Sequence, residues 1–134
     1  MTIREWCSED ERELKRLFLE YCAATKQTGD ADACWIGWQA QEVTVLVAEQ
    51  DGRLCGFGSL LTVPLAVSPY KAGVPQMLYG EPGTRAAVLL MKAGIAWYKQ
   101  QGITSLLIYT ALNQEKLWAK RHFRPKLMVM ERSL

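Results

Sequence analysis

The loop of residues 80–85 (GEPGTR) carries the clearest chemical signal in the sequence, because it places two glycines and a proline directly before a long apolar helix pattern. The first four N–H groups of a helix have no partner inside it, and they lie at the positive end of the helix dipole. A phosphate or diphosphate binds well there, and Arg85 adds a positive charge. The same arrangement also occurs without a ligand, because tight turns need glycine. Both interpretations stay open at this point.

The other reactive side chains form no metal-binding or nucleophile pattern. The four cysteines, Cys7, Cys22, Cys34 and Cys55, contain no CxxC pair, and the single histidine, His122, lies far from them in the sequence. We therefore expect no metal site and four reduced thiols, with Cys22 and Cys55 buried among apolar neighbours. His122 is expected at a surface helix end rather than in the role of a base.

The composition is that of one globular domain over residues 1–134. Apolar residues make up 49% of the chain and charged residues 22%, and no apolar run approaches the roughly 18–20 residues that a membrane span needs. The amino-terminal segment is charged and lacks the apolar core of a signal peptide, so we expect a cytoplasmic protein.

Charge divides unevenly between the two halves of the chain. Residues 1–69 carry 6 Lys/Arg and 11 Asp/Glu, a net charge of −5, whereas residues 70–134 carry 10 Lys/Arg and 3 Asp/Glu, a net charge of +7. A basic half attracts phosphate ligands or nucleic acid, or it is a solvated face. The basic residues form no run and no nucleic-acid motif is present, so nucleic acid is not the expected partner.

The first half of the chain predicts two strand and two helix segments before a return strand. An amphipathic helix follows a short strand, with Ser8 as its N-cap and Glu11 as the reciprocal capping partner. The dipeptide Asp51-Gly52 predicts a tight hairpin turn. The expected segments are a strand over 2–6, the helix after Ser8, a short helix over 33–41, and strands over 42–49 and 53–63.

The second half predicts a strand, a buried helix, a central strand, a last helix and a final strand. The expected segments are a loop over 64–73, strands over 74–79, 103–109 and 126–132, and helices over 84–101 and 113–122. The order β-α-α-β-β-β-α-β-α-β predicts an α/β (α+β) fold. Its centre is expected to be a mixed, mostly antiparallel sheet of six or seven strands flanked by about four helices.

Four sequence segments in this order resemble the GNAT superfamily of acyl-CoA-dependent N-acyltransferases, over essentially the whole chain. They are TIREWCSEDERELKRLF, VAEQDGRLCGFGSL, AWYKQQGITSLLIY and LWAKRHFRPKLMVMERSL. The resemblance implies the GNAT fold, a coenzyme A ester as donor, and an amine as acceptor.

The resemblance also implies where the donor binds. The family motif Q/R-x-x-G-x-G/A, which wraps the diphosphate of coenzyme A, aligns with Pro82, Gly83, Thr84, Arg85, Ala86 and Ala87. Only Ala87 fits the pattern; Pro82 replaces the Gln or Arg, and Arg85 replaces the first glycine. Arg85 then either clamps a phosphate or blocks its site. The pantetheine arm is expected along the backbone of Met77, Leu78 and Tyr79, in a gap between two strands, and the alternative is a continuous sheet. Asn113 resembles an asparagine that opens the last helix, where an N-cap is its alternative role.

The catalytic side chains of the family are only partly matched. Gln76 is on the strand where many members carry a glutamate base, and Trp118 takes the place of a tyrosine acid. Tyr109 is the candidate substitute acid, or it is an ordinary strand-end residue. The resemblance places Trp35, Trp38 and Tyr70 near the acceptor amine, where the two tryptophans could line a pocket for an apolar or cationic group. Core packing is the alternative role of the two tryptophans.

The sequence thus predicts an N-acyltransferase that moves an acetyl or other acyl group from acyl-CoA directly to an amine of a small molecule or protein. The alternative is a catalytically weak or inactive protein of the same fold, acting as a binding or regulatory module on a partner such as a host protein. A protein partner or a homodimer is compatible with the sequence, which does not determine the oligomeric state.

Overall fold

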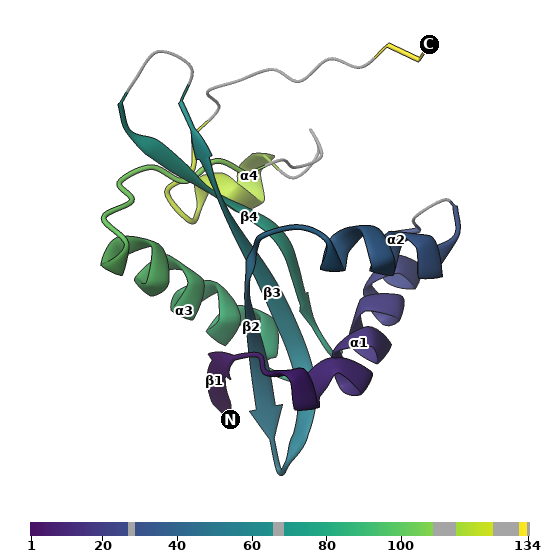
Figure 1. Ribbon diagram of the computed structural model, residues 1–134. Coiled ribbons are helices and arrows are strands. Elements are labelled where there is room, and N and C mark those ends of the chain that lie inside the picture. Colours follow the sequence, from purple (N-terminus) through teal and green to yellow (C-terminus); the bar gives the residue numbers. More distant parts are fainter. Residues whose placement is uncertain (27–28, 66–68, 109–114, 125–131, 134) are drawn as a thin grey trace.

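The computed structural model describes residues 1–26, 29–65, 69–108, 115–124 and 132–133. Its centre is an antiparallel sheet in the order β1-β2-β3-β4, with helices on both sides (Figure 1). The strands are β1 (Thr2–Glu5), β2 (Thr44–Gln50), β3 (Arg53–Pro64) and β4 (Lys71–Gly80). The predicted α/β class is confirmed.

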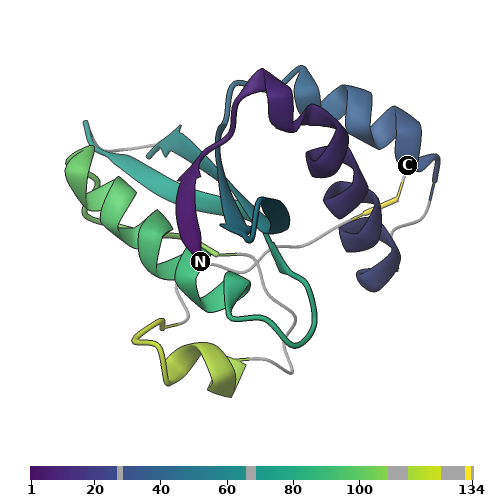
Figure 2. The same cartoon turned by 90° about the horizontal axis from the view of Figure 1, so that it is seen from below.

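The helices lie on opposite faces of the sheet. After a short 3₁₀ turn, η1 (Ser8–Asp10), α1 (Glu11–Ala24) and α2 (Ala31–Gln39) cover one face, and α3 (Ala86–Gln100) covers the other (Figures 1 and 2). The short α4 (Glu115–Ala119) follows near the end of the chain. Across the described ranges, no helix is both long and apolar enough to cross a membrane.

Each face of the sheet has its own hydrophobic core. On the α1 and α2 side, Leu17, Phe18 and both tryptophans of α2 pack against Val47 and Phe57. On the α3 side, the smaller core joins Leu46, Ala48, Cys55, Leu60, Ala86, Leu90 and Tyr98. Alternate residues of β2 therefore face opposite helix layers, as the period of a strand requires.

The β2–β3 hairpin forms at the predicted dipeptide. Asp51 and Gly52 have φ values of 54° and 74°, which is the left-handed pair that a two-residue turn needs to match the twist of its strands. The next hairpin contains a bulge, because Ser59 pairs with Met77 whereas Leu60 pairs with Pro75. Gln76 is the extra residue of that bulge.

The predicted N-cap at Ser8 is wrong by one position. Cys7 is the N-cap of the 3₁₀ turn, and Asp10, rather than Glu11, is its reciprocal capping partner. The Cys7 amide donates to Asp10 Oδ2 at 2.8 Å, which opens the 3₁₀ turn before α1. Arg4 also donates to both Asp10 oxygens, at 2.7 and 2.9 Å. This contact holds the Asp10 carboxylate near β1 and lowers its pKa to about 2.

The predicted loop over 64–73 is too long. Thr62 pairs with Gly73 and Pro64 with Lys71, so β3 and β4 extend to the ends of a long hairpin. The tip of that hairpin falls partly outside the described residues.

The predicted central strand over 103–109 is described only as a short parallel contact with β4. Gly73 donates to Ser105 O at 2.9 Å and accepts from the Leu107 amide at 2.8 Å. Tyr109, Asn113 and almost all of the final predicted strand lie outside the described residues. The predicted count of six or seven strands is therefore confirmed only in part.

Candidate functional site

The first turn of α3 presents main-chain amides without partners. Within the preceding loop, the Thr84 amide and hydroxyl both donate to Glu81 O, at 3.2 and 2.7 Å. Four amides here have no hydrogen-bond partner in the described part of the chain, and we call them the α3 amides: those of Gly83 and Arg85 before the helix, and of Ala87 and Val88 in its first turn. The first turn of this helix contains no acidic residue. These donors therefore form a favourable place for an anion.

Two glycines allow α3 to begin directly against the sheet. A Cβ atom at Gly80 would lie 2.5 Å from the Ala87 nitrogen, and one at Gly56 would lie 2.8 Å from the Ala86 Cβ. Both distances are too short for any side chain. The close approach places the α3 amides at the end of β4.

The one carboxylate of the loop points away from the α3 amides. Glu81 accepts from Arg53 Nη2 at 2.8 Å and lies 3.5 Å from Arg16 Nη2 of α1. Its charge is therefore balanced on the α1 side and is poorly placed to repel an anion. Arg85 is exposed and forms no ion pair within the described residues, so its side chain does not fill the site.

A cleft of about 370 Å³ runs beside β4. The cleft lies beside the part of β4 that follows Gly73. Among the described residues after α3 (101–108), pairing with β4 occurs only around Gly73. Pro75 supplies a physical reason, because proline has no N–H for a ladder and is confined to strand edges and bulges. The residues that would continue this parallel pairing beside Met77, Leu78 and Tyr79 lie outside the described residues, so the predicted gap stays a prediction.

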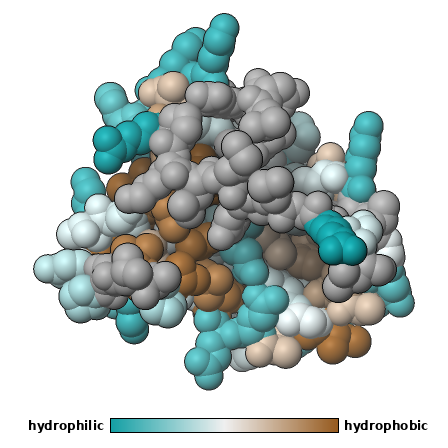
Figure 3. Space-filling view, turned by 90° about the horizontal axis from the view of Figure 1, so that it is seen from above, coloured by the Kyte–Doolittle hydropathy of each residue, from teal (hydrophilic) through white to brown (hydrophobic). Residues whose placement is uncertain are grey.

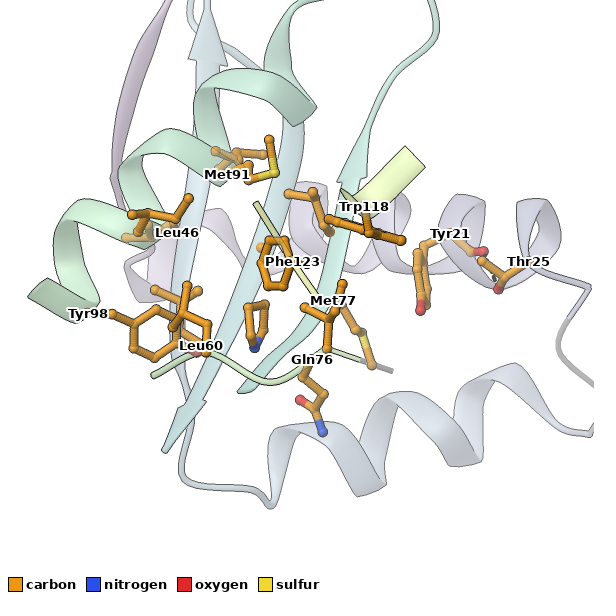
Figure 4. Close-up of a pocket in the computed structure, with 18 residues that line it drawn as sticks. Tyr21, Thr25, Leu46, Leu60, Gln76, Met77, Met91, Tyr98, Trp118 and Phe123 are labelled. Atoms are coloured by element: carbon orange, nitrogen blue, oxygen red, sulfur yellow. Dashed lines mark hydrogen bonds between the residues drawn. The ribbon is translucent and has the colours of Figure 1, made fainter. Parts of the chain in front are cut away.

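The cleft is lined mostly by apolar side chains. Figure 4 shows Met77 and Gln76 near its centre, Tyr21 and Thr25 on the side of α1, and Leu46, Leu60 and Tyr98 on the side of α3. Seen from above, hydrophobic surface gathers on the side of the molecule that carries α3 (Figure 3). A site of this kind accepts an extended, largely apolar group.

Tyr21 and Tyr98 line the cleft, and Tyr79 follows its lining residues on β4; the three hydroxyls differ in their hydrogen-bond partners. The Tyr98 hydroxyl donates to Leu61 O at 3.0 Å, and burial raises the pKa of Tyr98 to about 12. The Tyr79 hydroxyl donates to Glu20 at 3.1 Å, on the α1 side. The Tyr21 hydroxyl has no partner in the described part of the chain, and burial raises its pKa. Tyr21 therefore stays protonated at neutral pH.

Gln76 connects the cleft to the α2 side through a short polar chain. The Ser59 hydroxyl donates to Gln76 Oε1 at 3.3 Å, and Gln76 Nε2 donates to Gln41 Oε1 at 2.8 Å. These contacts fix the carboxamide at the bulge, next to the gap beside β4.

The structure separates the predicted acceptor residues. Trp35 and Trp38 are each 5% exposed and pack on Phe18, at ring-centroid distances of 5.4 and 5.2 Å, which favours the packing alternative. Tyr70 is 69% exposed near the β3–β4 tip. The candidate acid Tyr109 and the candidate cap Asn113 lie outside the described residues.

Sequence reasoning missed two residues of the cleft. Tyr21 follows the apolar stripe of α1 and reads as a core residue from its spacing. A tyrosine at the end of such a stripe also carries a hydroxyl group that can reach a cleft. Gly56 and Gly58 both lie on the α3 face of β3, but an added Cβ at Gly56 would lie 2.8 Å from the Ala86 Cβ, whereas one at Gly58 would meet nothing closer than 3.6 Å.

No protein-family model matches the chain, and no curated protein matches its sequence. Solved structures do match over nearly the whole chain. A ribosomal-protein-alanine N-acetyltransferase from Brucella melitensis biovar Abortus 2308 has 18% identity and a TM-score of 0.78, with 100% of each chain covered. Glucosamine-6-phosphate N-acetyltransferase from Arabidopsis thaliana has 16% identity and a TM-score of 0.70, covering 98% of this chain and 97% of the other.

A third neighbour is an aminoglycoside acetyltransferase from an uncultured soil metagenomic sample. It has 11% identity and a TM-score of 0.73, with 99% of this chain and 95% of the other covered. The α/β architecture with its antiparallel sheet agrees with these matches. The chain therefore has the fold of the GNAT superfamily of N-acetyltransferases.

Proposed function

We propose that this protein is an acyl-CoA-dependent N-acyltransferase that transfers an acyl group directly to an amine. The observation that carries the proposal is the junction of two features along β4. Gly80 brings the first turn of α3 against the end of that strand, and the cleft is lined by the same two elements farther along, at Leu78 of β4 and at Leu90 of α3. A phosphorylated carrier with a long apolar arm fits such a junction.

The donor is expected to bind by its two chemically distinct ends. The diphosphate accepts from the α3 amides, and the exposed Arg85 guanidinium adds charge-assisted hydrogen bonds. The pantetheine arm follows the outer edge of β4 at Met77 and Leu78, whose side chains line the cleft. The Tyr79 side chain is turned toward α1, so only its backbone is available to the arm.

The chemistry needs a neutral amine and a protonated leaving thiolate. As the amine nitrogen attacks the thioester carbon, the C–N bond forms and the C–S bond breaks. The nitrogen releases a proton that returns through water to an acid, and the sulfur takes up a proton from that acid. Tyr21 is proposed to donate that proton, because its hydroxyl is free and its raised pKa keeps it protonated. The fixed Gln76 carboxamide is proposed to orient the incoming amine. Positioning alone contributes several kcal/mol to such a reaction.

Calorimetric titration with acetyl-CoA and with free coenzyme A tests the donor site. We expect micromolar binding, and a loss of about 10- to 100-fold in the Arg85→Glu variant, since a hydrogen bond to a charged group contributes about 1.5–3 kcal/mol. The matched control is Lys99→Glu, the same charge change in the last turn of α3. Absence of binding at millimolar coenzyme A would overturn the proposal.

One observation favours the alternative of a binding module without catalysis. Among the described residues that line the cleft, none carries a carboxylate, an imidazole or a thiol. A thiol-release assay with a panel of amines separates the two functions. Coenzyme A binding without turnover of any amine would support the binding module, and release of free coenzyme A that depends on an amine would support the enzyme.

A further inference from the structure

The ion pairs in the described part of the chain all lie among residues 4–81. Residues 82–124, in contrast, carry 7 Lys/Arg and a single carboxylate, Glu115, which gives a net charge of +6. All seven of these cations are exposed, and none forms an ion pair or a side-chain hydrogen bond with the described residues. We call these seven residues the basic surface. They are Arg85, Lys92, Lys99, Lys116, Lys120, Arg121 and Arg124.

On α3 the cations of the basic surface form one row. Arg85, Lys92 and Lys99 recur every seven residues, a spacing that keeps them within about 40° of one another around the helix. The row lies on the outer face of α3, because Leu90 and Tyr98 of the same helix are buried in the core against the sheet. At the rise of a helix the row is about 21 Å long. The phosphates of coenzyme A all belong to one nucleotide, and a nucleotide bound at the α3 amides does not extend to the far end of this row.

The second part of the basic surface is the segment of residues 115–124, which begins with α4. Its four cations are exposed, whereas Trp118 and Phe123 of the same segment line the cleft (Figure 4). Residues of α3 line the same cleft. Figure 2 shows α3 and α4 together on the side of the molecule away from α1 and α2. The basic surface therefore flanks the cleft on two elements, and one of them begins at the α3 amides.

On the side of α1 and α2, charges are paired within the protein. Lys15 of α1 lies 3.1 Å from Asp32 of α2, and Arg16 lies 2.8 Å from Glu20. The Gln76 carboxamide, which is proposed to orient the amine, is held toward α2. An extended anionic partner is therefore attracted to the donor side of the site rather than to the acceptor side.

We propose that the basic surface docks an acidic carrier protein that presents the acyl group on a phosphopantetheine arm. Such an arm has the same thiol end as coenzyme A and one phosphate, so it fits the cleft and the α3 amides in the same way. The protein that holds the arm supplies the extended negative surface opposite α3 and α4. The acyl carbon exchanges its C–S bond for a C–N bond, the amine gives up a proton, and the carrier leaves with a protonated thiol. This inference rests on the proposed function and adds a second donor class to it.

The test uses the purified protein and a small acidic carrier protein in three forms: without the arm, with a free-thiol arm, and with an acetylated arm. Calorimetry measures the affinity for each form and for acetyl-CoA, without any amine. Because the arm and the docking surface bind together, the acetylated form should bind at least about 10-fold more tightly than the form without the arm. Raising the ionic strength from about 0.05 to 0.2 M should weaken binding of the carrier, since screening acts on exposed charges.

Charge reversal on the outer face of α3 separates the carrier from coenzyme A. Lys92→Glu and Lys99→Glu should each weaken binding of the acetylated carrier by about 10-fold, because they place like charges opposite one another. Both variants should leave the affinity for acetyl-CoA nearly unchanged, since exposed charges about 10 Å or more from the diphosphate are screened. The matched control is Arg12→Glu, at an exposed cation of α1 without an ion pair among the described residues, and it should change neither affinity.

Four outcomes would overturn the inference. If acetyl-CoA binds and the carrier does not, the proposed function stands alone. Equal affinity for the carrier with and without its arm would show that the arm does not enter the cleft, and an unchanged affinity in both lysine variants would show that the basic surface is not the docking site. A single-stranded RNA oligomer that displaces the carrier and is weakened by the same variants would assign the surface to nucleic acid. Failure of acetyl-CoA and of every carrier form to bind would overturn the proposed function as well.

Discussion

The closest backbone contact at the donor site gives the sharpest test of the geometry. In Gly80→Ala, the new Cβ would lie 2.5 Å from the Ala87 nitrogen and 3.1 Å from the Ala87 Cβ. The first distance is shorter than real Cβ contacts allow, and its partner is a backbone atom that cannot rotate away. The first turn of α3 must therefore move off the sheet by roughly an ångström, as overpacked sites do.

Two quantities should change together in Gly80→Ala. Overpacking should lower the free energy of unfolding by about 1–3 kcal/mol. The displaced Ala87 amide should also lose its contact with the diphosphate, which weakens coenzyme A binding by about 10- to 100-fold, the loss of one hydrogen bond to a charged group. Urea denaturation measures the first quantity, and calorimetric titration measures the second.

The control is Gly37→Ala, the same chemical change on the exposed face of α2, where an added Cβ meets nothing within 4 Å. That variant should gain up to about 1 kcal/mol from helix propensity and bind coenzyme A normally. If Gly80→Ala keeps both wild-type stability and wild-type affinity, the α3 amides are not held against the end of β4 and the donor site has been misplaced.

Three further predictions concern other residues. Tyr21→Phe should lower kcat by about 100-fold, the low end for loss of a general acid, and leave the calorimetric affinity for acyl-CoA unchanged; an equal loss of affinity would contradict the acid role. Because Arg4 lowers the pKa of Asp10 from 3.8 to about 2, this pair stabilises the fold fully above about pH 4, and its contribution of up to about 2 kcal/mol is lost as the pH falls toward 2. Asp10→Asn should flatten the acid limb of a stability–pH curve, and an unchanged limb would refute the assignment. His122 has a φ of 68°, so His122→Gly should raise stability by about 1 kcal/mol and His122→Ala should not; equal melting temperatures in all three proteins would show that the strain is absent.

The sequence predicts the fold well because its signals are local and agree with one another. The Asp51-Gly52 turn, the amphipathic α1 and the apolar helix after the glycine loop all form where the pattern places them. His122, predicted at a surface helix end, is exposed after α4, and its backbone adopts the left-handed conformation. The start of α1 was misplaced because a contact from Arg4, six residues away, holds Asp10 rather than Glu11 as the capping partner.

The candidate site could be predicted only in its main-chain part. The first N–H groups of any helix lack partners inside it, so the glycine loop before the helix pattern predicted free amides at this point of the chain. The α3 amides lie at that point. The burial of Trp35 and Trp38 depends on Phe18 and Phe57 across the core, which spacing along the chain does not reveal. The free hydroxyl of Tyr21 depends likewise on a cleft formed by three other elements.

Two adjacent residues, Pro75 and Gln76, weaken strand pairing beside the cleft. A proline inside a strand pattern cannot donate to a neighbouring strand, and Gln76 adds the extra residue that bends β4 at the same point. Both features weaken pairing on the outer edge of β4 beyond Gly73, where the described parallel contact ends. Two adjacent residues therefore give a chemical reason for weak pairing at the place where the donor arm is proposed to lie. The described layers on either face of the sheet, α3 and α1, both contribute residues to the cleft there.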